Sequence, residues 1–280
     1  MTPPTPARRA SAPEHFEDRL ARGAMLAPAG ANVVMQLSRR AVGRAVAESP
    51  SSSGSLMRHP LRRTRTTLTY IWVALWGDED ERIEMRRGVD AQHRRVRSAP
   101  DHEVAYDAFD ASLQLWVAAC MYVGSIQGYE MLYGPLDDAD ADRLYARCSR
   151  LATTLQVPLS SWPADREAFD AYWTEALTEL EVDEVTRRYL ADFVALRFLP
   201  GAVATLMRPL HRLLVGGFLE PAFRDLLALT WTPRDQRRFE VLRRVIRRGD
   251  RLSPGALARF PWNLVRYDAR RRLARGRPLV

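Results

Sequence analysis

Apolar residues recur at helical spacing along almost the whole of this 280-residue chain, and this periodicity is what most constrains its fold. No segment alternates β-branched with polar residues, and no Asn-Gly or Asp-Gly pair marks a β-hairpin. We therefore predict an all-α protein of about 10–12 helices. The helices should span residues 14–25, 31–48, 61–76, 79–97, 104–132, 137–156, 165–180, 183–198, 200–214, 219–228, 233–249 and 254–275.

Local signals support these boundaries and a single domain. Pro60 suits the first position of one helix, and Asp78 follows Gly77 where it can cap the next. With 46% hydrophobic residues, the chain can bury one large core. We expect a helical domain over 14–255, a disordered extension over 1–13, a mobile loop at Ser49–Ser55 and a basic segment over 256–280.

The positive charge of the chain is concentrated near its C-terminus. Arg234–Val280 holds fifteen arginines and four acidic residues, although the whole chain carries a net charge of only +8. Three interpretations remain open: a solvated helical face with a disordered tail, a surface for anionic membranes, or a nucleic-acid site, which no known motif supports. The chain has no lysine, which excludes Schiff-base enzymes and the lysine of a P-loop.

Cysteines and apolar segments limit the cellular context. Cys120 and Cys148 are too few for a disulfide framework, and Cys120 lies in an apolar run that favours a core position over a haem-thiolate role. No targeting signal and no apolar segment long enough to span a bilayer is evident. We expect a cytoplasmic protein, with peripheral membrane contact as the alternative.

His93 is unusual because its neighbours place it on an apolar stripe. Met85, Val89 and Val96 share one helical face with His93, while the remaining positions are charged. A histidine that faces the core is either a hydrogen-bonded structural residue or a ligand to a metal or to haem iron. The stripe alone does not separate these two interpretations.

Arginines and threonines alternate on the predicted helix at 61–76. Arg63 and Thr67 are four residues apart and therefore lie on one face, but Arg62 with Thr66 and Arg65 with Thr69 offer alternative registers. A fixed guanidinium can donate hydrogen bonds to negative charge that develops on dioxygen. The alternative is a solvated first turn, although positive charge there opposes the helix dipole.

An ordered set of short motifs resembles the rubber-oxygenase catalytic domain family, which includes the latex-clearing proteins and the endoplasmic-reticulum oxygenase of mycophenolic acid synthesis. The resemblance covers about residues 20–255, and its order along the chain makes it specific. Its motifs are Ala29-Gly30-Ala31 with Gln36; Arg63 and Thr67, with His93 after a spacing of 26 residues; Tyr106, Asp110, Leu113, Trp116 and Val117; Leu155-Gln156-Val157-Pro158; and Gly216, Gly217 and Pro221.

The resemblance implies a haem b site. It assigns His93 as the axial iron ligand and places Arg63 and Thr67 on the distal side, with dioxygen as co-substrate. Trp72 and Trp116 are the tryptophans that we assign to contact with the haem. The chain departs from the family at Arg39-Arg40, where members often have His-Pro, and at Ala118, where they often have histidine. These departures concern proton delivery and substrate choice rather than the iron ligand.

Two functions therefore compete at this point. The first is a haem b-dependent oxygenase that acts with dioxygen on an apolar alkenyl or isoprenoid substrate inside a helical domain. The second is a non-catalytic helical module that binds haem or lipid and presents its C-terminal arginine cluster to an anionic membrane. Nucleic-acid binding is the weakest alternative.

Overall fold

The computed structural model describes residues 15–49 and 56–280, and within these ranges the fold is all-α, as predicted. The predicted disordered extension and nearly all of the predicted loop at Ser49–Ser55 lie outside the described residues. The helices are α1 (Phe16–Leu20), η1 (Gly23–Leu26), α2 (Ala29–Leu37), α3 (Arg40–Ala47), α4 (Pro60–Trp76), α5 (Glu79–His93), α6 (Ala111–Tyr133), α7 (Asp138–Cys148), α8 (Arg150–Thr153), η2 (Leu159–Ser161), α9 (Arg166–Thr178), α10 (Glu184–Val194), α11 (Gly201–Phe218), α12 (Pro221–Leu226), α13 (Pro233–Leu252), α14 (Gly255–Ala258) and α15 (Trp262–Leu273).

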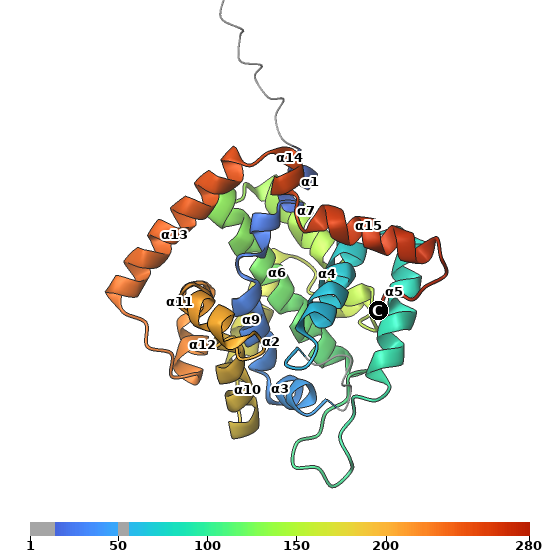
Figure 1. The fold of residues 1–280 in the computed structure, drawn as a ribbon. Coiled ribbons are helices and arrows are strands. Elements are labelled where there is room, and N and C mark those ends of the chain that lie inside the picture. Colours follow the sequence, from blue (N-terminus) through green and yellow to red (C-terminus); the bar gives the residue numbers. More distant parts are fainter. Residues whose placement is uncertain (1–14, 50–55) are drawn as a thin grey trace, which may run out of the picture.

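Helix α6 runs through the middle of the molecule, and the other helices surround it (Figure 1). Helix α2 packs on α6, and α11 packs on α2. Helices α4 and α5 lie on one side of this pair, with α15 across α4, while α11 and α13 lie on the other side (Figure 1). The two sides enclose the space in which the candidate site lies.

Capping side chains fix the starts of the two helices that matter most for the site. Helix α4 begins at Pro60, whose missing N–H costs nothing in a first turn. Asp78 caps α5 by accepting a hydrogen bond from the Glu81 backbone N–H at 2.8 Å, and the Glu81 side chain accepts one from the Asp78 N–H at 3.1 Å. The short connection at Gly77 therefore keeps α4 and α5 adjacent.

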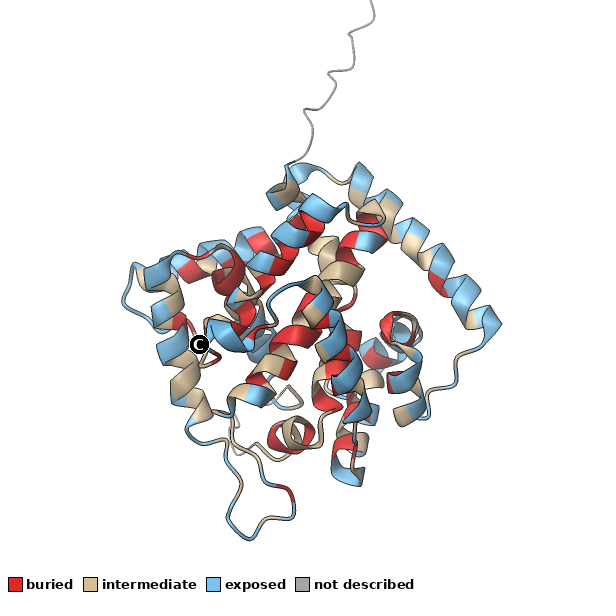
Figure 2. Cartoon of the chain, turned by 180° about the vertical axis from the view of Figure 1, so that it is seen from behind, coloured by how far each residue is buried: buried red, intermediate tan, exposed pale blue. Residues whose placement is uncertain are grey.

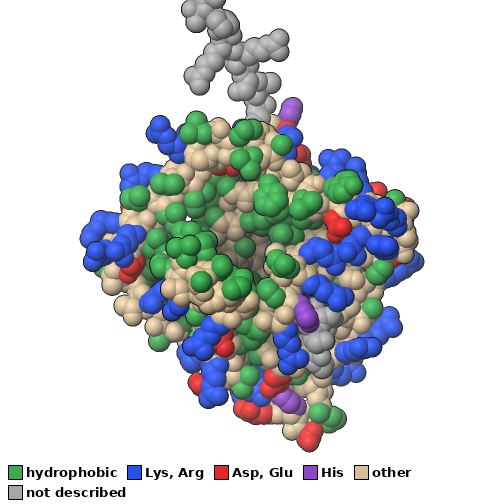
Figure 3. Space-filling model, viewed as in Figure 1, with side chains coloured by type: hydrophobic (Ala, Val, Ile, Leu, Met, Phe, Trp, Pro, Cys, Tyr) green, Lys and Arg blue, Asp and Glu red, His purple; other side chains and the backbone are tan. Residues whose placement is uncertain are grey.

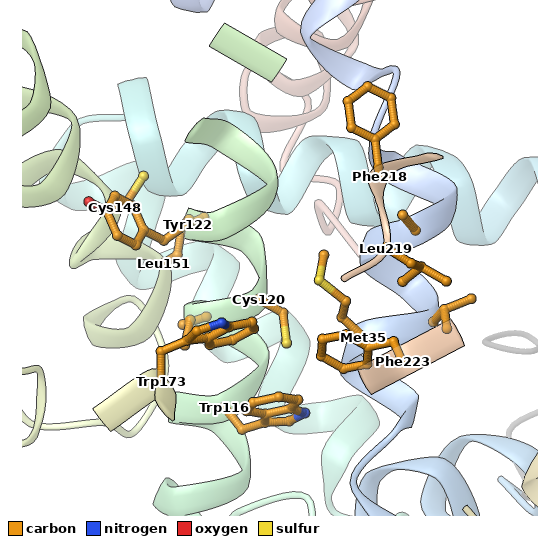
Figure 4. Close-up of a cluster of buried hydrophobic side chains, with 14 of the residues drawn as sticks. Met35, Trp116, Cys120, Tyr122, Cys148, Leu151, Trp173, Phe218, Leu219 and Phe223 are labelled. Carbon is orange, nitrogen blue, oxygen red and sulfur yellow. The ribbon is translucent and has the colours of Figure 1, made fainter. Parts of the chain in front are cut away.

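The core is a cluster of aromatic, sulfur-containing and aliphatic side chains around α6. Trp116 and Cys120 from α6 meet Met35 from α2, Trp173 from α9 and Phe223 from α12 (Figure 4). The helices present buried residues to the centre and exposed residues outward (Figure 2). Burial of this apolar surface is the main source of stability for such a fold.

Several predicted helices are shorter or broken, among them the predicted 137–156 helix, which is divided at Ser149 into α7 and α8. The predicted 31–48 helix is interrupted at Ser38, whose hydroxyl donates to the Val34 carbonyl at 2.8 Å and competes with the backbone. The predicted 254–275 helix is divided before Pro261, because proline supplies no N–H to a helix interior. The predicted 79–97 helix ends at His93.

The C-terminal residues pack against the domain. Helix α15 lies against α4, and Ala269 and Leu279 join Val73 and Met85 in a second buried cluster. The basic side chains Arg266, Arg270 and Arg271 stay exposed on the outer face of α15. Within residues 15–49 and 56–280, no helix combines the length and the apolar character needed to cross a bilayer.

Candidate active site

A cavity of about 760 Å³ lies between the two sides of the helical array. Its volume falls in the range of about 300–1,000 Å³ that is typical of sites for small molecules and cofactors. Residues of α2, α4, α5, α6, α10 and α11 line it, and most of its wall is apolar. Representative apolar wall residues are Leu37, Ile71, Val89, Leu113, Val117 and Met121.

Arg63 and Thr67 of α4 both face this cavity. The Arg63 guanidinium makes no ion pair or hydrogen bond with any described side chain or carbonyl. The Arg63 side chain has a large accessible surface, but this surface faces the recessed cavity and not bulk solvent. The resulting loss of hydration lowers the pKa of Arg63. An arginine that gives up hydration without a protein partner can bind an anionic or electron-rich ligand group.

The neighbouring arginine of the same helix points elsewhere. Arg65 donates to the backbone oxygen of Leu279 at 3.2 Å and lies 3.5 Å from the Asp268 carboxylate, both in the C-terminal segment. Thr69 is buried and donates to the Arg65 carbonyl at 2.8 Å. The register Arg65 with Thr69 therefore serves the packing of α15. Arg62 and Thr66 line the cavity together with Arg63 and Thr67.

His93 is the last residue of α5, and it lines the same cavity. Its Nδ1 atom is buried without a hydrogen-bond partner, and its Nε2 atom has none among the described residues. Burial and then the charge of Arg63 lower the pKa of His93, whereas Asp90 and Asp107 raise it. The imidazole is therefore held neutral, which is the form that can bind iron.

Hydrogen bonds of three neighbouring side chains and one aromatic contact hold the end of α5 in place. The Asp90 carboxylate accepts a hydrogen bond from the Gln156 side-chain amide, which in turn accepts one from the Gln114 amide. The Gln156 backbone N–H donates to the Gln114 side-chain oxygen at 3.0 Å. The Phe109 ring meets the His93 ring edge-on, with centroids 6.1 Å apart. These contacts link α5 and α6 around the imidazole.

A second histidine, His211 of α11, also lines the cavity, although its place in a helix of mixed character did not mark it as a candidate. Its Nδ1 atom lies 3.2 Å from the Val194 carbonyl, an arrangement that makes Nδ1 the donor and leaves Nε2 as an acceptor. Burial lowers its pKa. Its Nε2 is only 2.9 Å from where a Cβ on Gly30 would lie, so Gly30 permits the close approach of α2 to α11.

Tyr189 of α10 is another cavity residue that sequence reasoning missed. Burial raises its pKa, and the nearby Arg63 opposes that effect. Its hydroxyl has no hydrogen-bond partner within the described part of the chain. In the sequence, Tyr189 lies four residues before Phe193, another lining residue, and therefore on the same face of the helix. This spacing alone did not indicate a cavity residue, because many core tyrosines have the same spacing to an aromatic neighbour.

The two tryptophans assigned to the haem are not among the residues of the cavity wall: Trp116 lies in the main core, and Trp72 is partly buried against the second cluster. Trp116 is 1% exposed, stacks on Trp173 with centroids 5.2 Å apart, and donates to the Gln36 carbonyl at 3.0 Å. Trp72 stacks on Trp76 with centroids 4.7 Å apart. Trp76 and Trp262 are the tryptophans that line the cavity. Cys120 is buried in the core, and burial raises its thiol pKa well above the usual value.

The family model described as the catalytic domain of the ER-bound oxygenase mpaB/B' and rubber oxygenase matches residues 18–248 of this chain. The chain belongs to this oxygenase family. The matched range contains Arg63, Thr67 and His93 and covers every helix that lines the cavity except α15.

Two mycobacterial proteins are similar to this oxygenase-family chain over nearly all of its length. They are the uncharacterized proteins Mb2261 of Mycobacterium bovis and Rv2237 of Mycobacterium tuberculosis, each 46% identical over 256 residues. The alignments cover 91% of this chain and 100% of each relative. No solved structure gave a significant match.

The family cavity has three chemical parts. One wall carries the neutral, unpaired imidazole of His93, and a neighbouring wall carries the Arg63 guanidinium and the Thr67 hydroxyl. The remaining wall is mostly apolar, and its polar residues include His211, Tyr189, Asn32, Gln36, Asp107 and Gln114. Among residues 15–49 and 56–280, no three His, Cys, Asp or Glu side chains cluster closely enough to hold a metal ion by themselves.

Proposed function

We propose that this protein is a haem b-dependent oxygenase that acts with dioxygen on an apolar, alkene-containing substrate of the isoprenoid type. The observation that carries the proposal is the cavity that brings together the unpaired His93 imidazole, the unpaired Arg63 guanidinium and apolar walls. Membership of an oxygenase catalytic-domain family supports the same reaction class.

The residues present fit a haem with one protein ligand. A buried imidazole nitrogen without a partner is costly unless a bound group uses the ring, and His93 has such a nitrogen. His93 would therefore supply the nitrogen that binds the haem iron, and its lowered pKa keeps one ring nitrogen unprotonated near neutral pH. Bound haem b supplies the iron at which dioxygen is activated.

Arg63 and Thr67 would act on the dioxygen side. The Arg63 guanidinium offers several N–H donors inside a recessed cavity, where a hydrogen bond to developing negative charge is stronger than in water. The Thr67 hydroxyl, one turn further along α4, can orient a water molecule or a second oxygen atom. Arg65 is excluded from this role by its contacts with the C-terminal segment.

The apolar walls select the substrate class. Aliphatic, aromatic and methionine side chains make up most of the lining, so moving a hydrocarbon chain from water into this site is favourable. The same walls keep bulk water away from the reacting groups. The substrate would lie along these walls with its double bond toward Arg63.

The proposal is tested by haem content and oxygen consumption. Purified protein that has been supplied with haem should show a Soret absorption band and should consume dioxygen when an isoprenoid alkene is added. A matched saturated hydrocarbon should give no consumption. Failure to bind haem would reject the proposal.

The second candidate is a carrier that binds haem or a lipid in the same cavity without turnover. The mostly apolar lining of the cavity is compatible with binding of haem or a lipid by such a carrier. Haem binding without alkene-dependent oxygen consumption would favour a haem carrier. Binding of a fluorescent fatty acid without any haem binding would favour a lipid carrier.

A further inference from the structure

The cavity opens on one face of the molecule, and hydrophobic side chains surround the opening. Figure 3 shows them around a central hollow, over α11 on one side and over α14 and the start of α15 on the other. Six exposed apolar residues belong to α11, to α14, to α15 and to the turn between α14 and α15, and we call them the apolar rim. They are Leu206, Met207, Leu210, Leu257, Phe260 and Leu264.

Helix α11 leads from the solvent into the cavity. Leu206 is 79% exposed, and Met207 and Leu210 are about half as exposed as Leu206. His211 and Leu214, one and four residues beyond Leu210, line the cavity. The apolar face of this helix therefore starts outside the molecule and continues into the site.

The segment opposite repeats this arrangement. Leu257 is 64% exposed, Phe260 55% and Leu264 56%, whereas Trp262 between them is buried and lines the cavity. Large apolar side chains with this exposure lose free energy in water. Six of them around one opening form an exposed apolar patch, and such patches usually mark a site of interaction with another molecule or a membrane.

Arginines border the apolar rim. Arg208 and Arg212 lie on α11, and Arg266, Arg270 and Arg271 lie on α15; all five are exposed. None forms a salt bridge with a described carboxylate, although Arg212 is near enough to Asp235 to contribute to its lowered pKa. Figure 3 shows basic side chains at the periphery of the same face. Arg272 differs, since it pairs with Asp268 at 2.9 Å and donates to the Pro278 carbonyl at 3.2 Å.

We propose that this face docks on an anionic lipid bilayer, so that apolar substrate enters the cavity directly from the membrane. The apolar rim would contact the acyl chains, and the unpaired arginines would contact the phosphate groups of the lipids. The use of the opening by a substrate rests on the proposed function. Docking itself does not require haem.

Charge favours a bilayer over a second copy of this chain. Two copies that met through this face would bring Arg208, Arg212 and the α15 arginines toward their own equivalents, and like charges repel. An anionic bilayer offers the opposite charge around an apolar interior. The arrangement of charge and apolar surface therefore matches a membrane.

The test measures sedimentation of the full-length protein with vesicles. One vesicle is phosphatidylcholine alone, and the other is an equimolar mixture of phosphatidylcholine and phosphatidylglycerol. The rim variant replaces exposed residues of α11, α14 and α15: Leu206→Gln, Leu257→Gln and Leu264→Gln. The control variant replaces three exposed apolar residues on α5, η2 and α10: Ile83→Gln, Leu159→Gln and Val185→Gln.

We expect the parent and the control variant to bind the mixed vesicles, and the rim variant to bind them at least tenfold more weakly. Arg266→Glu with Arg270→Glu and Arg271→Glu should lower binding to mixed vesicles and change binding to phosphatidylcholine little. Haem uptake should be the same in all four proteins, which separates this test from that of the proposed function.

Three results would overturn the proposal. The parent could fail to bind mixed vesicles, or the rim and control variants could bind them equally. A parent that sediments as a dimer without lipid, with a monomeric rim variant, would assign this face to self-association instead.

Discussion

The guanidinium of Arg63 and the imidazole of His93 face one cavity from adjacent helices, and the charge of Arg63 adds to burial in lowering the pKa of His93. Neither side chain has a hydrogen-bond partner in the described part of the chain. A buried imidazole nitrogen is normally paired, and a guanidinium that faces a recessed cavity gives up part of its hydration. The lack of protein partners at both groups supports the proposal of a ligand that both contact.

Replacing Arg63 with alanine should slow turnover without releasing haem. The guanidinium is assigned to the dioxygen side, and loss of one preorganised donor typically lowers a rate by about 100-fold to 1,000-fold. Thr67→Val, which removes only a hydroxyl, should cost less. The measurement is alkene-dependent oxygen consumption, normalised to haem content. Unchanged rates in Arg63→Ala, with a loss in Arg62→Ala, would show that the register on α4 is wrong.

Arg65→Ala should lower the stability of the protein, which Arg63→Ala should leave unchanged. Arg65 joins α4 to the C-terminal segment through the Leu279 carbonyl and Asp268, so its loss should lower the free energy of unfolding by about 1 kcal/mol. Arg63→Ala removes an unpaired cation and should not destabilise the apo-protein. Urea denaturation of the three haem-free proteins tests this. A larger loss of stability in Arg63→Ala than in Arg65→Ala would contradict the assigned contacts.

Gly30→Ala should disturb the wall of the cavity that carries His211. The new Cβ would lie 2.9 Å from His211 Nε2 and 2.9 Å from a Val215 methyl group, closer than normal contact. Overpacking of this kind costs about 1–3 kcal/mol, more than the roughly 1 kcal/mol that alanine gains over glycine within a helix. Thermal unfolding should show a lower Tm. Gly249→Ala, where no atom lies within 4 Å, should not. An unchanged or raised Tm in Gly30→Ala would refute the close approach.

The apo-protein should lose stability as the pH falls below about 6.5. Burial lowers the pKa of both His93 and His211 below that value, with a further contribution from Arg63 at His93. As the pH falls, these histidines take up protons in the unfolded chain before they do so in the folded protein. The free energy of unfolding therefore decreases until the pH reaches the pKa of the histidines in the folded protein. Each histidine contributes at most about 1.4 kcal/mol per pH unit.

The variant His93→Gln with His211→Gln isolates this contribution. Its free energy of unfolding should fall less steeply than that of the parent between about pH 7 and pH 5, because the two titrating groups are gone. All other ionisable groups are the same in the two proteins. Equal slopes for the two proteins would contradict the lowered pKa values.

Most of the helical fold could be predicted because its signals are local. Pro60, Gly77 and Asp78 marked the boundary between α4 and α5, and the structure places both helix starts within one residue of the prediction. The breaks at Ser38 and Ser149 could not be predicted, because serine is compatible with a continuous helix and the neighbouring helices set the direction of the next segment: α3 packs on α2 and α10, and α7 and α8 pack on α6. Tertiary packing overrides local propensity at such positions.

The site was only partly accessible from sequence. His93, Arg63 and Thr67 could be selected from spacing and resemblance, and the structure brings all three to one cavity. Trp72 and Trp116 lie outside the cavity lining, and helical spacing alone does not distinguish a core-facing side from a cavity-facing side. His211 and Tyr189 were missed because they come from helices far along the chain, which only the tertiary fold brings opposite α4.

Haem titration followed by absorption spectroscopy, with His93→Ala and His211→Ala compared to the parent, tests the central claim most directly. Both histidines line the cavity and each has a free nitrogen, so either could bind iron. We predict that the parent and His211→Ala bind one haem per chain with the same Soret band. His93→Ala should lose that band while keeping its helical circular dichroism. Haem binding by His93→Ala that equals the parent, or its loss in His211→Ala alone, would contradict the assignment of His93 as the iron ligand.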